Sequence, residues 1–168
     1  MSASHHHPSP ARSIGFALLT TTDQRTEKED ESGRTVRGLL EAAGHRIVRA
    51  GLSPNSPAEI RRFLEEALAD PAIEAIITLG GTGVSPRDRT VDTLEAMGGK
   101  KMDGFGERFR QLSFEQVGTF AMMSRSALYL LNGRPVFALP GSVKAGRLAT
   151  EELILPLVPH LVEELRRS

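Results

Sequence analysis

The 168-residue sequence contains no cysteine, which excludes disulfides, thiolate catalysis, cysteine-based zinc sites and iron–sulfur clusters. It also lacks any apolar run approaching the roughly 20 residues that a membrane-spanning helix needs. Its 21 basic and 21 acidic side chains cancel, so net charge gives no support to non-specific binding of nucleic acid or of an anionic membrane. We therefore expect neither a nucleic acid nor a membrane as a partner.

The first 12 residues are rich in serine and proline and have no apolar core of the kind that a signal peptide carries. A cytoplasmic location is expected on that ground. His5, His6 and His7 are potential metal ligands, but the composition around them favours a tail without fixed structure, or a remnant of cloning. Residues 13–168 are predicted to form one domain, because a chain of this length with 39% apolar residues buries a core without a metal or disulfide.

Apolar periodicity alternates between strand and helix along that domain. Strands are expected at 13–21, 46–52, 72–79 and 134–139, and helices at 35–43, 57–70, 90–97, after Gly104 and from Ser142 onward. The strand at 72–79 is apolar on both faces, which predicts a central, parallel position. This order predicts an α/β fold with a mostly parallel sheet and helices on both faces.

Local signals set several of the expected boundaries. Ser56 with Pro57 and Glu59 forms a capping box, and Thr90 and Ser142 are expected to cap later helices. The charged segment 22–32 is predicted to be a solvated loop, on charge alone.

The segment 120–131 is apolar and ambiguous between helix and strand. Its Met122 and Met123 are expected to pack in the core. The dipeptide Asn132-Gly133 predicts a tight turn, and Pro156 and Pro159 are expected to interrupt or kink the last helix.

The loop Gly80-Gly81-Thr82-Gly83 directly follows the best predicted strand. Ligands of open α/β sheets bind at the carboxyl ends of strands, and glycines let backbone N–H groups approach an anion closely. Arg87 and Asp88 add a cation and a carboxylate, which together suit a nucleotide with its metal. The alternatives are an ordinary strand–helix turn and a surface ion pair. Because neither standard nucleotide fingerprint occurs, a P-loop or a Rossmann dehydrogenase is not expected.

The segment 80–90, GGTGVSPRDRT, resembles the signature of the MoaB/MogA family of molybdenum cofactor biosynthesis proteins, and MoaB more closely. Other matching segments occur in the expected order, from about residue 14 to residue 160. They are Asp30-Glu31-Ser32-Gly33, which resembles the loop before the first helix, Gly104-Phe105-Gly106-Glu107, Ser124-Arg125-Ser126 and Leu139-Pro140-Gly141-Ser142.

The resemblance implies a molybdopterin-binding fold, a three-layer α/β domain that assembles as a trimer or hexamer. It also implies adenylylation of the terminal phosphate of molybdopterin with Mg²⁺-ATP, which releases pyrophosphate, and other molybdenum cofactor enzymes as possible partners. Such a phosphate has a second pKa of about 6 and is mostly dianionic at neutral pH. The protein then needs no strong base; its work is to hold two anions together and to neutralise the leaving pyrophosphate.

By the same resemblance, Asp88 is expected to orient the magnesium-bound nucleotide. The expected nucleotide- and phosphate-binding residues are Ser32, Gly33, Gly80, Gly81, Thr82 and Gly83. The expected molybdopterin-binding residues are Ser124, Ser126, Pro140, Gly141 and Ser142. For the Pro140 loop, an ordinary turn with a helix cap is the alternative.

Position 55 departs from the family pattern. Active members usually carry an aspartate in a Pro-Asp pair there, whereas this chain has Pro54-Asn55. Asparagine keeps the shape but removes a charge that would hold the metal. Asn55 therefore leaves two hypotheses, an adenylyltransferase or a non-catalytic oligomeric molybdopterin-binding protein. Asp23 and Glu27 are candidates to supply the missing charge, and spacing does not decide between them. A third alternative is a related domain acting on pyridine nucleotides.

Overall fold

The structure, a computed structural model, describes residues 12–167. The predicted tail therefore lies, apart from Arg12, outside the described residues. Six strands form one sheet in the order β2-β1-β3-β6-β5-β4. Their bounds are β1 Gly15–Thr21, β2 Arg46–Ser53, β3 Ala75–Leu79, β4 Lys100–Met102, β5 Ala127–Leu131 and β6 Arg134–Leu139. Strands β2, β1, β3 and β6 pair in parallel, and β5 pairs antiparallel with both of its neighbours, β6 and β4.

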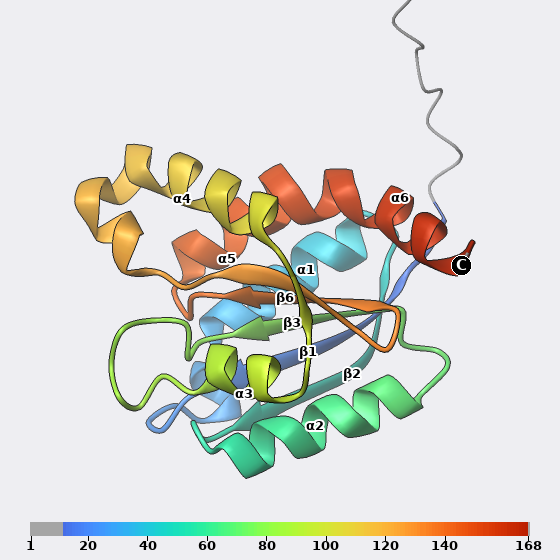
Figure 1. The fold of residues 1–168 in the computed structure, drawn as a ribbon, viewed down its shortest axis with the longest axis horizontal. Helices are drawn as coiled ribbons and strands as arrows, with labels where there is room; N and C mark the ends of the chain where they lie inside the picture. Colours follow the sequence, from blue (N-terminus) through green and yellow to red (C-terminus); the bar gives the residue numbers. More distant parts are fainter. Residues whose placement is uncertain (1–11, 168) are drawn as a thin grey trace, which may run out of the picture.

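Helices cover both faces of the sheet (Figure 1), which confirms the predicted three-layer α/β fold. One face carries α1 (Glu31–Ala42), α4 (Asp103–Val117), α5 (Val143–Ala149) and α6 (Leu155–Arg166). The other face carries α2 (Pro57–Ala69) and α3 (Thr90–Ala96). Each face has its own apolar cluster, because alternate strand residues point to opposite sides. Every residue of β3 is buried, as its central position requires.

Helix α1 begins four residues earlier than predicted. The Asp30 carboxylate accepts a hydrogen bond from the Gly33 N–H at 2.9 Å and so caps the helix. Ser32 and Gly33 consequently lie buried in the first turn of α1, not in a loop before it. The predicted solvated loop also contains a short 3₁₀ turn, η1 (Glu27–Glu29).

Of the three expected caps, two are confirmed. The hydroxyls of Ser56 and Ser142 accept from backbone N–H groups three residues on, at 3.5 and 3.2 Å. Thr90 is not a cap; it is the first residue of α3, and its hydroxyl lies 3.3 Å from that of Thr21. The Thr90 hydroxyl thus bonds to the end of β1 and does not cap its own helix.

The ambiguous segment 120–131 contains both kinds of structure. A 3₁₀ helix, η2 (Gly118–Met123), leads into β5, and the turn at Asn132-Gly133 has the predicted left-handed backbone, with φ of 48° and 70°. The prediction that Met122 and Met123 pack in the core is wrong, because their exposed fractions are 76% and 48%. Strand β4, which the sequence did not predict, is short and exposed and so has no apolar pattern.

The C-terminal helix is irregular, but the irregular turn precedes the two prolines that were expected to interrupt or kink it. A π-helical turn, η3 (Thr150–Ile154), separates α5 from α6. Pro156 follows in the first turn of α6, and Pro159 lies inside that helix. Within residues 12–167, no helix is both long and apolar enough to cross a bilayer.

The buried His45 ties the start of β1 to the loop before β2. Its Nδ1 accepts from the Ile14 N–H at 3.2 Å, and its ring meets that of Phe16 edge-on at 5.5 Å. Burial lowers the pKa of His45 below the ordinary value, although the nearby Glu74 carboxylate opposes this shift. The neutral ring is therefore the form that the fold favours.

Stability should fall as the pH drops through the ordinary histidine pKa of about 6.5, because the unfolded chain then takes up a proton that folded His45 resists. The free energy of unfolding, measured with urea at about pH 7.5 and about pH 5.5, tests this expectation. The variant His45→Asn keeps an acceptor for Ile14 but does not titrate, so it should lose less stability over this interval. Equal losses would contradict the assignment.

Candidate functional site

The loops at the carboxyl ends of the parallel strands surround a hollow of about 400 Å³. It lies at the topological switch point of the sheet, because β2 is added on one side of β1 and β3 on the other. Four loops supply its lining. The residues are Thr20, Thr21, Thr22, Asp23, Gln24 and Arg25 from the end of β1, Asn55 after β2, Gly80, Gly81, Arg87 and Asp88 after β3, and Gly141 and Ser142 after β6.

The first two glycines after β3 have left-handed backbones, with φ of 101° at Gly80 and 70° at Gly81. A Cβ atom on Gly80 would overlap the Thr21 carbonyl. One on Gly81 would overlap the Thr90 hydroxyl and lie 2.9 Å from Asn55 Oδ1. Glycine is thus required at both positions, and the turn presents bare backbone to the hollow.

Asp88 lies beside this turn. Its Oδ2 accepts from the Ser85 N–H at 2.9 Å, and a Cβ atom on Gly83 would be 2.7 Å from the same oxygen. The carboxylate therefore folds back over the loop that carries it and lines the hollow, next to Arg87.

Arg125 holds the loop after β3 through hydrogen bonds to three of its carbonyl groups. Its backbone N–H donates to the Thr82 carbonyl at 2.7 Å, its Nε to the Gly83 carbonyl at 3.0 Å and its Nη2 to the Asp88 carbonyl at 3.2 Å. The guanidinium also pairs with Asp92 at 2.9 Å and lowers the pKa of that carboxyl. The sequence singled out only the serines on either side of Arg125, because nothing local shows which carbonyls an arginine will meet.

The expected molybdopterin-binding residues are not all brought together. Gly141 and Ser142 line the hollow, whereas Pro140, Ser124 and Ser126 are not among its lining residues. The two serine hydroxyls instead bond each other at 2.9 Å, and Ser126 is fully buried.

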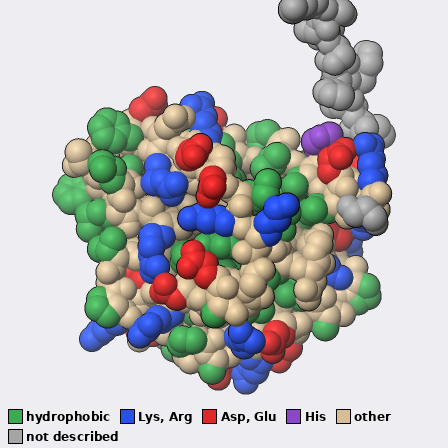
Figure 2. Space-filling view, in the orientation of Figure 1, with side chains coloured by type: hydrophobic (Ala, Val, Ile, Leu, Met, Phe, Trp, Pro, Cys, Tyr) green, Lys and Arg blue, Asp and Glu red, His purple; other side chains and the backbone are tan. Residues whose placement is uncertain are grey.

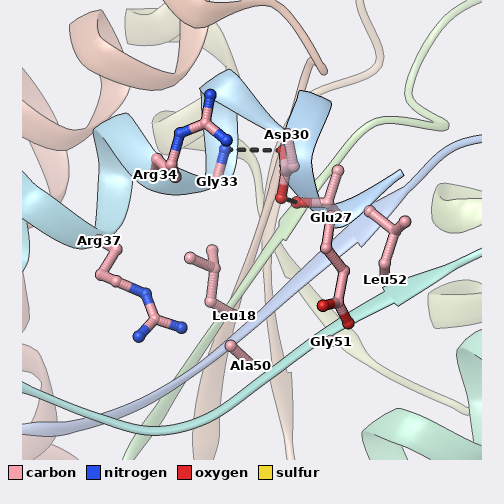
Figure 3. Close-up of a pocket in the computed structure, with 10 residues that line it drawn as sticks. Leu18, Glu27, Asp30, Gly33, Arg34, Arg37, Ala50, Gly51 and Leu52 are labelled. Carbon is pink, nitrogen blue, oxygen red and sulfur yellow. Dashed lines mark hydrogen bonds between the residues drawn. The ribbon is translucent and has the colours of Figure 1, made fainter. Parts of the chain in front are cut away.

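A second hollow, of about 500 Å³, lies beside α1 (Figure 3), and of the two expected nucleotide-binding residues of α1 the fully buried Ser32 does not line it. Gly33 lines it, and Figure 3 shows Arg37 and Glu27 extending over the strand residues of its floor. Thr20 lines both hollows, and its hydroxyl donates to Asp30 at 2.8 Å. Gly33 is thus a neighbour of the glycine-turn hollow but not part of it.

Two charged residues of the hollow come from the segment predicted to be a solvated loop. Arg25 donates to the Gly141 carbonyl across the opening at 3.4 Å. Asp23 accepts from the backbone N–H of Asn55 at 2.8 Å and lies 3.5 Å from its side-chain amide nitrogen. Asp23 is one of the candidate carboxylates that the sequence indicated, but Arg25 was not singled out, because charge alone does not distinguish this side chain from its solvated neighbours.

The oxygens around the hollow suit a hard cation such as Mg²⁺. The carboxylates of Asp23 and Asp88 line it, and Asn55 Oδ1 is a buried acceptor without a partner in the part of the chain that the structure describes. Within residues 12–167 there is no cluster of three or more His, Cys, Asp or Glu side chains that could hold a metal by itself. These residues therefore fit a cation that arrives with part of its coordination already supplied by a phosphate ligand.

Replacing Gly81 should separate the cost of its backbone conformation from the cost of the close contact. The matched control is Gly98, whose φ is 77° and whose Cβ would meet nothing within 4 Å. Gly98→Ala should lower the free energy of unfolding by about 1 kcal/mol. Gly81→Ala should cost about 2 kcal/mol more, because a methyl group overlaps the Thr90 side chain. Urea unfolding measures both; equal losses would mean that the loop yields without cost.

Comparison with known proteins agrees with this geometry. A family model described as "Probable molybdopterin binding domain" matches residues 15–160. A molybdenum cofactor biosynthesis protein B from Halalkalibacterium halodurans is 36% identical over 100% of this chain and 99% of its own. The one from Bacillus subtilis is 33% identical over the same shares.

Solved structures show the same fold. A crystal structure of a molybdenum cofactor biosynthesis protein B is 34% identical, with a TM-score of 0.91 over 95% of this chain and 100% of that one. The tungsten cofactor synthesizing protein MoaB of Pyrococcus furiosus is 29% identical, with a TM-score of 0.83 over 94% and 99% of the two chains. Fold and sequence agree, and the chain belongs to the MoaB/MogA family of molybdopterin-binding domains.

Proposed function

We propose that this protein acts in molybdenum cofactor biosynthesis, where it binds molybdopterin and transfers AMP from Mg²⁺-ATP to its terminal phosphate. The observation that carries the proposal is the hollow itself, in which a bare glycine turn, two guanidinium groups and two carboxylates meet at the ends of parallel strands. Backbone N–H groups and arginines suit phosphates, and carboxylates suit the accompanying cation.

The reaction needs positioning more than proton transfer. An oxygen of the molybdopterin phosphate attacks the α-phosphorus of ATP, the bond to the bridging oxygen breaks, and pyrophosphate leaves. Since the attacking phosphate is already dianionic, no side chain has to remove a proton. Magnesium supplied with the nucleotide neutralises the leaving pyrophosphate. The glycine turn and Arg87 hold the phosphates in line, and Asp88 orients the metal-bound nucleotide.

Asp88→Asn should lower the rate of adenylyl transfer about a hundredfold, because it removes the carboxylate charge that orients the metal-bound nucleotide. Formation of adenylyl-molybdopterin and of pyrophosphate from Mg²⁺-ATP measures this. The matched control is Asp103→Asn, a change of an exposed aspartate in the first turn of α4 that does not line the hollow.

Absence of any adenylyl product from the wild-type protein would contradict the proposal. If molybdopterin still bound, the non-catalytic binding protein that Asn55 suggests would become the better description.

We also propose that the protein associates with further copies of itself, as the trimer or hexamer that the family resemblance implies. The support is an apolar patch formed by Phe114 and Val117 of α4 and by Phe120, Met122 and Met123 of η2. Their exposed fractions range from 45% to 76%. Figure 2 shows hydrophobic side chains gathered at the edge of the molecule where α4 runs into η2. Patches of this kind on soluble proteins usually mark an interaction surface.

Phe120→Glu should shift the protein from an oligomer toward the 18.2 kDa monomer, because it puts a charge into the apolar patch. Sedimentation or light scattering measures the mass. Val84→Glu is the matched control, since Val84 is equally apolar, 64% exposed and outside the patch. A monomeric wild-type protein, or equal masses for both variants and the wild type, would contradict the proposal.

A further inference from the structure

The geometry points to Asp23 as the residue that supplies the second carboxylate of the nucleotide site, with Asn55 as the positioning residue that holds it there. The inference rests on the proposed function, because it concerns how this chain receives Mg²⁺-ATP. It addresses position 55, where the family resemblance leads us to expect a carboxylate and this chain has an amide.

Asn55 holds both oxygens of the Asp23 carboxylate. Its backbone N–H donates to Oδ1 at 2.8 Å, and its side-chain Nδ2 donates to Oδ2 at 3.5 Å. The two loops are joined beside this pair by the Thr22 N–H, which donates to the Ser53 carbonyl at 2.8 Å. A carboxylate on the loop after β1 is thereby brought to the loop after β2, next to the position that lacks one.

The two ends of the Asn55 amide face different groups, the Asp23 carboxylate and the glycine turn. Its nitrogen faces Asp23, while its oxygen is buried, has no partner within the described chain and lies where a Cβ on Gly81 would meet it at 2.9 Å. The side chain of an aspartate at position 55 could not donate to Asp23, and it would place two negative charges side by side. With asparagine, one carboxylate remains at this corner and Asp88 is the other in the lining, so the hollow has two carboxylates to set against Arg25 and Arg87.

This arrangement predicts which property each substitution changes. Asp23→Asn should weaken binding of Mg²⁺-ATP about tenfold, the effect of losing one well-placed charge on a bound cation, but should leave binding of metal-free ATP in EDTA unchanged or stronger. Asn55→Ala should weaken Mg²⁺-ATP binding less, because the backbone donor to Asp23 remains. A purely structural role would lower the affinity for both forms of the nucleotide alike.

The decisive variant exchanges the two side chains. Asp23→Asn combined with Asn55→Asp keeps one carboxylate and one amide at this corner and should recover most of the Mg²⁺-dependent affinity that Asp23→Asn loses. Titration calorimetry with ATP, with and without Mg²⁺, measures these affinities, and urea unfolding verifies that each variant is folded. Asp103→Asn serves as the control for a change of net charge.

An unchanged ratio of Mg²⁺-ATP to metal-free ATP affinity in Asp23→Asn would overturn the inference. So would a wild-type protein that does not bind Mg²⁺-ATP. If the wild type binds Mg²⁺-ATP and the ratio falls in Asp23→Asn but no adenylyl-molybdopterin forms, the proposed transfer fails while the assignment of Asp23 stands.

Discussion

The left-handed turn at Gly80 and Gly81 is the constraint on which the rest of the site depends. Both residues lie so close to neighbouring loops that a single added carbon would meet Thr21, Thr90 or Asn55. The loops after β1, β2 and β3 therefore converge only because these two positions have no side chain. The hollow between them is a consequence of this close approach, and glycine backbone forms part of its lining.

The antiparallel end of the sheet holds this turn in place. Strand β5 begins just after Arg125, whose side chain and N–H reach the carbonyls of Thr82, Gly83 and Asp88. The apolar patch of α4 and η2 ends at Met123, two residues before that arginine. The apolar patch proposed for self-association is thus close in the chain to Arg125, which bonds the loop proposed to hold phosphates.

The charges of the hollow balance locally as well as overall. Two arginines and two aspartates line it, so it has little net attraction for a polyanion on its own. A nucleotide that brings a divalent cation changes this, because the carboxylates then have a charge to bind while the arginines and N–H groups face phosphate. Asn55 fits this balance, since an added carboxylate beside Asp23 would make one corner of the hollow more negative.

The sequence by itself determined the alternation of strands and helices, the central position of β3, the caps at Ser56 and Ser142 and the glycine loop with Asp88, because each depends on residues close together in the chain. Two local predictions failed: the Asp30 cap, which starts α1 earlier, was overlooked, and Met122 and Met123 were placed in the core, although both are exposed. Only the tertiary structure decided that Asp23 meets Asn55 from 32 residues away and that Arg125 bonds the glycine loop from 42 residues away. A parallel sheet brings the ends of separate strands to one edge, and no local spacing in the sequence encodes which side chains meet there.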